Sequence, residues 1–248
     1  MTTEKPLADR IAVVTGASRG IGAATALALA KLGAHVVAIA RTVGGLEELD
    51  DRIRAAGSTA TLVPLDMKDH DGLVRLAVAL NERYGRVDVL VGNAGIGGPS
   101  SPLSHIEPKV WDDVMAVNVT ANYHLIRCMD TLLRQSTAGR AVFVTSGAAQ
   151  RAAAYRGAYS ISKAALEVMA RTYAAETVTT PVRVNLFNPG PIRTRMRAAV
   201  MPGEDPMTLD TPEQAAEKLA ELCLPGFNQT CKLYDYPTKT IRDFPPVS

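Results

Sequence analysis

The chain has 248 residues, of which 47% are hydrophobic and 21% charged, so it can bury the core of one large α/β domain or of two small domains. This composition argues against a disordered, collagen-like or coiled-coil protein. Lys and Arg number 27 and Asp and Glu number 25, and the formal net charge of +2 gives no overall field that would attract nucleic acid or an anionic membrane.

Cysteine usage and the N-terminal sequence suggest a compartment. The three cysteines, Cys128, Cys223 and Cys231, are odd in number and lack Cys-x-x-Cys spacing, as in a reduced cytosolic protein. Segment 1–10 is polar, and the most apolar stretch, 23–40, is interrupted by lysine, glycine and histidine. A membrane span needs about 20 uninterrupted apolar residues. We therefore expect a soluble, cytoplasmic protein without a membrane or nucleic-acid partner.

Short β-branched runs alternate with longer helical runs along the chain. The predicted strands are 11–15, 35–40, 59–63, 87–91, 141–145, 182–187 and 232–235. The predicted helices are 20–31, 46–56, 69–84, 111–134, 158–177 and 212–224. This alternation predicts an α/β fold: a doubly wound, parallel sheet of about seven strands with helices on both faces. No linker divides the chain, so we expect one domain over 1–248, with its core at 10–235 and a proline-rich tail at 236–248.

A glycine-rich loop, Thr-Gly-Ala-Ser-Arg-Gly-Ile-Gly, joins the first predicted strand to the first helix. Gly16, Gly20 and Gly22 permit a tight turn and a close approach of the backbone to a pyrophosphate, which predicts a Rossmann-type dinucleotide site. Ser18, Arg19 and Ile21 complete the loop.

Other interpretations of this loop fit the sequence less well. It could be a turn without a ligand, although a strand before it and an Ala-rich helix after it are the context that a phosphate cradle requires. Residues 16–20 also match the Gly-x-Ser-x-Gly elbow of hydrolases, but only 15 residues precede them, too few for the upstream strands of that fold. No Gly-Lys-Ser/Thr follows, so the loop is not a P-loop.

The residues after the second predicted strand indicate which nicotinamide cofactor binds. A free ribose 2′-OH is usually met by Asp or Glu about 20 residues after the glycines, but here Arg41 follows the strand and no acid comes before Glu47. A guanidinium group suits a 2′-phosphate. Arg41 and Arg19 therefore predict NADP, with NAD as the alternative; the competing interpretation is two ordinary surface arginines.

Tyr159 and Lys163 lie four residues apart at the start of helix 158–177, so they share one helix face. An ammonium beside a phenol lowers the phenol pKa from about 10, which suits proton exchange with an alcohol or ketone oxygen. Tyr155 has no lysine four residues on and is the weaker candidate. Ser160-x-x-Lys163 also fits the Ser-x-x-Lys of penicillin-recognising enzymes, but their partner motifs are absent. An isolated Tyr-x-x-x-Lys is also common on surface helices.

Further polar and glycine-containing markers appear in order along the chain: Asp66, Asn93-Ala94-Gly95, Asn118, Ser146, and Asn188-Pro189-Gly190 with Thr194. Together with the glycine loop and the Tyr-x-x-x-Lys pair, this series resembles the short-chain dehydrogenase/reductase family over roughly 10–235. The ordered series is far more specific than any one of its motifs.

The resemblance implies catalytic roles for four residues. Ser146 would orient the substrate oxygen, and Tyr159 would be the general acid/base. Lys163 would bind the nicotinamide ribose and tune Tyr159, while Asn118 would help to hold a water-linked proton relay. The cofactor would supply the hydride and the protein would supply orientation and a proton.

The resemblance also implies contacts to the two ends of the cofactor. The segment after the third strand would contact the adenine, and the Asn-Ala-Gly turn would line the cleft. The segment after the sixth strand would hold the nicotinamide carboxamide. The residues implied at these contacts are Asp66, Met67, Asn93, Ala94, Gly95, Pro189, Gly190, Ile192 and Thr194.

The sequence departs from the family in two places. Gly92 stands where the family commonly has asparagine, which would loosen the turn before Asn93. Segment 230–236 lacks the usual Asp-Gly-Gly ending, which puts the C-terminal oligomer contact in doubt.

Segments 97–105, 148–156 and 193–208 are expected to face the substrate. They carry few acids and the arginines Arg151, Arg156, Arg193, Arg195 and Arg197. These arginines indicate either an anionic substrate, such as a carboxylate or a CoA or carrier-protein thioester, or solvated side chains paired at an oligomer interface. His105 and His124 have no partner at ligand spacing, so no metal site is predicted.

The leading hypothesis is an NADP-preferring oxidoreductase that transfers a hydride between NADP(H) and a small carbonyl or secondary alcohol. We expect a homodimer or homotetramer, with contacts through the helices at 111–133 and 158–175. A 3-oxoacyl-thioester reductase is the alternative among enzymes. A non-catalytic NADP-sensing protein is the alternative of another class, although such a sensor need not keep Ser146, Tyr159 and Lys163 together.

Overall fold

The computed structural model describes residues 5–244, which contain one eight-stranded sheet in the order β3-β2-β1-β4-β5-β6-β7-β8. All neighbouring strands are parallel except β7 and β8. The strands are β1 (Ile11–Thr15), β2 (His35–Ala40), β3 (Ala60–Pro64), β4 (Val89–Gly92), β5 (Arg140–Val144), β6 (Arg183–Asn188), β7 (Lys232–Asp235) and β8 (Thr240–Asp243). The predicted doubly wound α/β fold is confirmed, with one strand more than expected.

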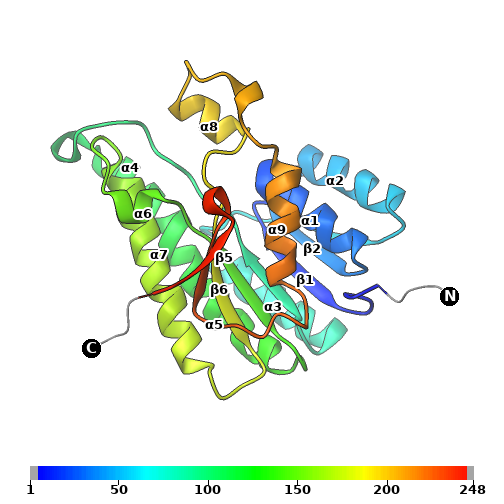
Figure 1. Cartoon of the computed structure of the whole chain (residues 1–248). Coiled ribbons are helices and arrows are strands. Elements are labelled where there is room, and N and C mark those ends of the chain that lie inside the picture. Colours follow the sequence, from blue (N-terminus) through cyan, green and yellow to red (C-terminus); the bar gives the residue numbers. More distant parts are fainter. Residues whose placement is uncertain (1–4, 245–248) are drawn as a thin grey trace.

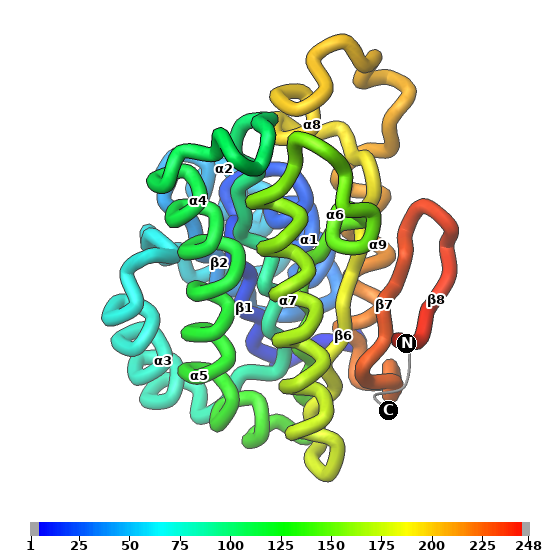
Figure 2. The backbone as a smooth tube through the Cα atoms, turned by 90° about the vertical axis from the view of Figure 1, so that its left-hand side faces the viewer, coloured from blue at the N-terminus to red at the C-terminus, as the bar shows by residue number. Residues whose placement is uncertain are grey.

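Helices cover both faces of this sheet (Figures 1 and 2). One layer packs α1 (Gly20–Lys31), α2 (Val43–Ala55) and α9 (Pro212–Leu222) in one buried apolar cluster. The other layer packs α3 (His70–Tyr84), α5 (Ala121–Arg134) and α7 (Gly157–Glu176) in a second cluster. Along β1, Ala12 and Val14 enter the first cluster and Ile11 and Val13 the second, because successive side chains of a strand point to opposite faces.

Three short helices complete the structure at the carboxyl ends of the strands: α4 (Pro108–Met115), α6 (Ala148–Arg151) and α8 (Arg195–Val200). Figure 1 shows α8 standing above the sheet at this end. Because ligands of doubly wound sheets bind outside the carboxyl ends of the strands, these segments surround the expected site. None of the helices within residues 5–244 is long and apolar enough to cross a bilayer.

Local signals explain some helix boundaries. The αL residue Gly85, with φ of 68°, ends α3, and Thr211 with Gln214 forms a capping box at the start of α9. The predicted helix 111–134 is divided: α4 is followed by a π-helical turn, Ala116–Thr120, before α5 begins. Apolar periodicity does not reveal this turn. A π-helical turn continues the helix and differs from it only in having i→i+5 instead of i→i+4 hydrogen bonds.

Part of the predicted tail is structured. β8 pairs with β7, and the turn between them is the 3₁₀ helix Tyr236–Thr238. All four β8 residues are exposed, so this edge strand carries none of the alternation that marks a half-buried strand. Residues 245–248 of the predicted tail lie outside the described residues.

Candidate functional site

The glycine loop between β1 and α1 has a geometry that fits an anion. Gly16 and Gly20 adopt positive φ of 66° and 57°, and a Cβ on Gly22 would lie 2.3 Å from the backbone oxygen of Gly16. Helix α1 starts after Arg19 with no side-chain cap and no acidic residue in its first turn. The first N–H groups of α1 therefore stay available to a ligand, and this donor set fits a pyrophosphate.

β1 and β4 are joined at their carboxyl ends, where the strand order reverses. The Thr15 hydroxyl donates to the backbone oxygen of Val91 at 3.2 Å and accepts from the backbone N–H of Asn93 and of Ala94, both at 3.0 Å. Asn93 Nδ2 in turn donates to the Thr15 backbone oxygen at 2.9 Å. The Asn93–Ala94 turn thus lies beside the glycine loop, at the switch point where a dinucleotide binds in such sheets.

The two arginines predicted at the adenosine end are both exposed at the carboxyl ends of β1 and β2. The sequence suggested that no acid lies near Arg41. In the structure, however, Arg41 Nη1 lies 3.8 Å from Asp66 Oδ2. Both groups of this pair are largely solvated, so the contact contributes little to stability. Asp66 also accepts the Lys68 backbone N–H at 3.0 Å, which shapes the turn after β3, and Met67 is buried there.

Tyr159 and Lys163 lie on the first two turns of α7, against the carboxyl end of β5. Lys163 Nζ donates to the Val144 backbone oxygen at 2.7 Å and lies 5.9 Å from the centroid of the Tyr159 ring. A Cβ on Gly95 would lie 3.5 Å from the same Nζ. The fold therefore brings the Tyr-x-x-x-Lys face of α7 to the loop that follows β4.

The sequence predicts that Lys163 lowers the pKa of the Tyr159 phenol, but in the structure this pKa is raised. Burial raises the pKa of Tyr159, and the Ser146 hydroxyl and the Arg156 guanidinium oppose that rise. Burial also lowers the pKa of Lys163 to about 8, against an opposing effect of Glu167. Arg156 is thus a cation beside Tyr159 that favours the phenolate.

Asn118 sits in the π-helical turn between α4 and α5. Its Oδ1 accepts the Ile96 backbone N–H at 2.8 Å, and its Nδ2 donates to the Ile96 backbone oxygen and to Ser162 Oγ, both at 2.9 Å. Asn122 Nδ2 donates to the Asn118 backbone oxygen at 2.9 Å. Asn118 therefore joins the loop after β4 to α7, one residue before Lys163.

Ser146 follows β5, and the next residue, Gly147, is hydrogen-bonded to the Asn188 side chain. Asn188 Oδ1 accepts the backbone N–H of Gly147 at 2.9 Å and of Gly190 at 3.1 Å. Asn188 Nδ2 donates to Asp235 Oδ1 at 2.6 Å. One buried amide thus fixes the turn after Ser146 and the turn after β6 to each other.

The segment after β6 reaches back to the glycine loop. Gly190 has φ of 66°, and a Cβ there would lie 2.3 Å from Cγ of Pro237. Thr194 Cγ2 would lie 3.5 Å from a Cβ on Gly20. Ile192 is buried. The predicted nicotinamide segment, residues 189–194, therefore lies next to the predicted pyrophosphate loop.

A hollow of about 380 Å³ opens beside Ser146 on the side of the β7–β8 hairpin. Asn188, Arg151 and Arg242 are among the residues that line it. Tyr159 and Lys163 are not among these lining residues, so this hollow does not contain the Tyr-x-x-x-Lys face of α7.

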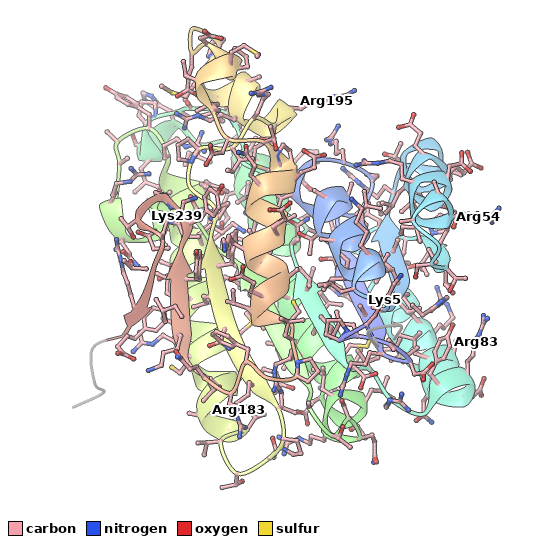
Figure 3. The ribbon with its side chains drawn as sticks, turned by 45° about the vertical axis from the view of Figure 1, so that its right-hand side comes forward. Lys5, Arg54, Arg83, Arg183, Arg195 and Lys239 are labelled. Atoms are coloured by element: carbon pink, nitrogen blue, oxygen red, sulfur yellow. The ribbon has the colours of Figure 1, made fainter. Side chains whose placement is uncertain are left out.

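The five arginines near the site have different surroundings. Arg197 donates to both Glu204 carboxylate oxygens at 2.6 Å, and Arg193 donates to the Leu209 backbone oxygen at 3.2 Å. Figure 3 shows Arg195 pointing outward from its segment, and Arg151 is also exposed. The guanidinium carbon of Arg156, in contrast, lies 5.0 Å from the centroid of the Tyr159 ring.

Most of the predicted site residues converge on one end of the sheet, whereas three structural partners escaped the sequence reasoning. Asp235 was overlooked as a site residue because the final strand lacks the usual ending. Ser162 and Glu167 are buried on α7, and Thr145 Oγ1 donates to Glu167 Oε1 at 2.8 Å. Ser162 lies three residues after Tyr159 and Glu167 lies four residues after Lys163 on α7, and this spacing was the available signal.

This architecture defines a Rossmann-type dinucleotide-binding protein: a glycine-lined helix start at the switch point of a parallel sheet, with a tyrosine and a lysine beside it. The model of the short chain dehydrogenase family matches residues 10–205. The chain therefore belongs to the short-chain dehydrogenases, a family of oxidoreductases.

Individual relatives agree. The uncharacterized oxidoreductase YciK of Escherichia coli K12 is 39% identical over 83% of this chain and 82% of its own length. Cis-4-hydroxycyclohexanecarboxylate dehydrogenase of Sinomonas cyclohexanicum is 35% identical over 87% of this chain and 89% of its own. A short chain dehydrogenase from Shigella flexneri 2a, solved in complex with NADP, superposes with a TM-score of 0.90 at 35% identity, covering 95% of this chain and 100% of that one.

Proposed function

We propose that the protein transfers a hydride between NADP(H) and a small carbonyl compound or secondary alcohol, with Tyr159 as the general acid/base. The observation that carries this proposal is the placement of Tyr159 and Lys163 on one face of α7, beside the loop after β4 and the end of β5. A phenol held there can exchange a proton with a substrate oxygen.

The cofactor proposal rests on the fit of the cradle. The glycines allow the backbone of the loop to lie close to a pyrophosphate, and the start of α1 offers N–H groups without a side-chain cap. Arg19 and Arg41 are exposed beside it, available to a 2′-phosphate, and the Shigella flexneri protein binds NADP. When bound, the nicotinamide would supply or accept the hydride.

The chain's own residues would do the rest. The Ser146 hydroxyl would hold the substrate oxygen beside the Tyr159 phenol, which gives up its proton in reduction and recovers one in oxidation. Lys163 would donate to the nicotinamide ribose hydroxyls. Asn118 would position the α7 face through Ser162. The Sinomonas relative is a cis-4-hydroxycyclohexanecarboxylate dehydrogenase, and that compound is a secondary alcohol.

We further propose a single domain that assembles as a homodimer or homotetramer. Large apolar side chains stay exposed on the two helices expected at the contact: Tyr123 on α5, and Ile161 and Val168 on α7. Burying such side chains against a second copy would be favourable.

The decisive variant is Tyr159→Phe, compared with Tyr155→Phe, which removes the exposed hydroxyl of the weaker acid/base candidate. NADPH oxidation is followed with aldehydes, ketones, quinones and 3-oxoacyl thioesters, with NADH in parallel. Tyr159→Phe should lower turnover about 10²- to 10⁴-fold while the Kd for NADPH stays within about threefold, and Tyr155→Phe should match the wild type. Full activity of Tyr159→Phe would contradict the role of Tyr159.

The same panel separates the other candidates. Turnover confined to the thioesters favours the 3-oxoacyl-thioester reductase. Tight NADPH binding by the wild type without turnover of any carbonyl favours a sensor.

A further inference from the structure

Arg156 is the last residue before α7, and its side chain is half-buried. The guanidinium carbon lies 5.0 Å from the centroid of the Tyr159 ring, and Nη2 would lie 3.8 Å from a Cβ on Gly97. The backbone of Arg156 forms an isolated parallel bridge with Ser101. The cation is therefore held between the loop after β4 and the proposed acid/base.

One donor of this guanidinium has no partner. Arg156 Nη1 is shielded from solvent and makes no hydrogen bond within residues 5–244. A buried donor on a charged group that is left unsatisfied is costly, so such an atom at a functional site calls for a ligand. Arg197 differs because its Nε and Nη2 already donate hydrogen bonds to the two carboxylate oxygens of Glu204.

The ring of Tyr159 does not replace a ligand. A guanidinium over an aromatic face is attracted to the π electrons, but Nη1 of Arg156 still lacks an acceptor. A planar carboxylate supplies two acceptor oxygens in the geometry that a guanidinium prefers. Because Arg156 touches the tyrosine that would protonate the carbonyl oxygen, an anion bound to it must lie close to that carbonyl.

We propose that Arg156 binds a carboxylate on the substrate, so that the enzyme reduces oxo acids, or oxidises the corresponding hydroxy acids, in which carboxylate and carbonyl are a few bonds apart. This inference rests on the proposed function and names its substrate class. In reduction the carbonyl carbon accepts a hydride from NADPH and its oxygen a proton from Tyr159, which gives the hydroxy acid and NADP⁺. The carboxylate itself is unchanged.

The test compares each oxo acid with its uncharged methyl ester. The probes are 2-oxobutanoate, 3-oxobutanoate and 4-oxopentanoate, which place the carbonyl at increasing distance from the carboxylate. NADPH oxidation is measured for the wild type, Arg156→Leu and Arg156→Lys. The control is Arg171→Leu, which removes another arginine of the same helix that lies over an aromatic ring, that of Phe244.

In the wild type at least one acid should exceed its ester in kcat/KM by tenfold or more. Arg156→Leu should lower kcat/KM for that acid about 100-fold, mostly through KM, and leave the ester within about threefold. Arg156→Lys should recover part of the loss because it restores a positive charge. Arg171→Leu should behave as the wild type.

Three outcomes would overturn the inference. Equal losses for acid and ester, with a shifted pH profile, would mean that Arg156 acts only on the ionisation of Tyr159. Preference for the esters, or turnover of neutral carbonyls alone, would exclude a carboxylate partner while leaving the proposed function intact. No turnover of any carbonyl would instead contradict the proposed function, and this inference with it.

Discussion

Asn188 on β6 donates a 2.6 Å hydrogen bond to Asp235 on β7, 47 residues away in the chain. Asp235 is buried and also accepts hydrogen bonds from Thr238 and Arg242, so the β7–β8 hairpin is fixed to the same carboxylate. The Asn188 amide also accepts hydrogen bonds from the turns at Gly147 and Gly190. The hairpin is therefore connected through Asn188 to both sides of the proposed site.

Asp235→Ala should therefore impair both stability and catalysis. The variant leaves the Asn188 amide and the Arg242 guanidinium without their acceptor, which should lower the free energy of unfolding by about 1–3 kcal/mol. Loosening of the two turns should lower kcat about 10- to 100-fold. Urea unfolding and NADPH-oxidation kinetics measure the two effects. Asp243→Ala, which removes an exposed carboxylate of the same hairpin, should change stability by less than about 0.5 kcal/mol.

A methyl group at Gly22 should damage the cradle, whereas one at Gly44 should not. A Cβ on Gly22 would lie 2.3 Å from the Gly16 backbone oxygen and 2.4 Å from Asn93 Nδ2. Gly22→Ala should cost about 1–3 kcal/mol of stability and weaken NADPH binding. Gly44, in the first turn of α2, has open space around its Cβ position, so Gly44→Ala should leave binding unchanged. Fluorescence titration with NADPH measures the difference, and equal affinities of the two variants would contradict the cradle.

Charge reversal at Arg41 should change cofactor preference. Arg41→Asp removes a cation from the proposed 2′-phosphate site and places a carboxylate where a ribose hydroxyl could bind. The Kd for NADPH should rise about 10- to 100-fold while the Kd for NADH falls or stays constant. Arg54→Asp, on the outer side of α2 (Figure 3), is the control and should leave both constants unchanged. An unaltered ratio in Arg41→Asp would rule Arg41 out as the selector.

Lys163 should make stability depend on pH in the alkaline range. Its pKa is about 8 in the folded protein, because of burial, and 10.5 as the ordinary value. Between these values the unfolded chain binds more protons than the folded one, so the unfolding free energy from this group rises with pH, by about 3 kcal/mol in total. Below pH 8 both states are protonated and the contribution is at its lowest.

The measurement is urea unfolding between pH 7 and 10.5 for the wild type and Lys163→Met. The difference between the two curves should grow with pH over this window because other groups cancel. Lys31→Met, at the exposed end of α1, should run parallel to the wild type. A constant difference for Lys163→Met would mean that Lys163 keeps its ordinary pKa.

The strand and helix pattern could be read from the sequence because it depends on local spacing. β1, β2 and α1 have the predicted bounds, since buried parallel strands are continuous apolar runs and glycine ends the helix. β8 could not be read, because its four exposed residues pair only by virtue of the hairpin that returns them to β7. The π-helical turn at Asn118 escaped for a different reason: apolar spacing continues through it, and its signal is a side-chain hydrogen bond from Asn122 to the Asn118 backbone oxygen.

The sequence by itself determined the order of the motifs and the sharing of a helix face by Tyr159 and Lys163, because both follow from spacing and the 3.6-residue period of a helix. Only the tertiary structure decided that Lys163 is buried against Val144, that Asp66 approaches Arg41, and that Arg156 rather than its four neighbouring arginines lies against Tyr159. These relations join segments through loops whose paths depend on packing, and burial changes proton affinity in ways that spacing cannot express.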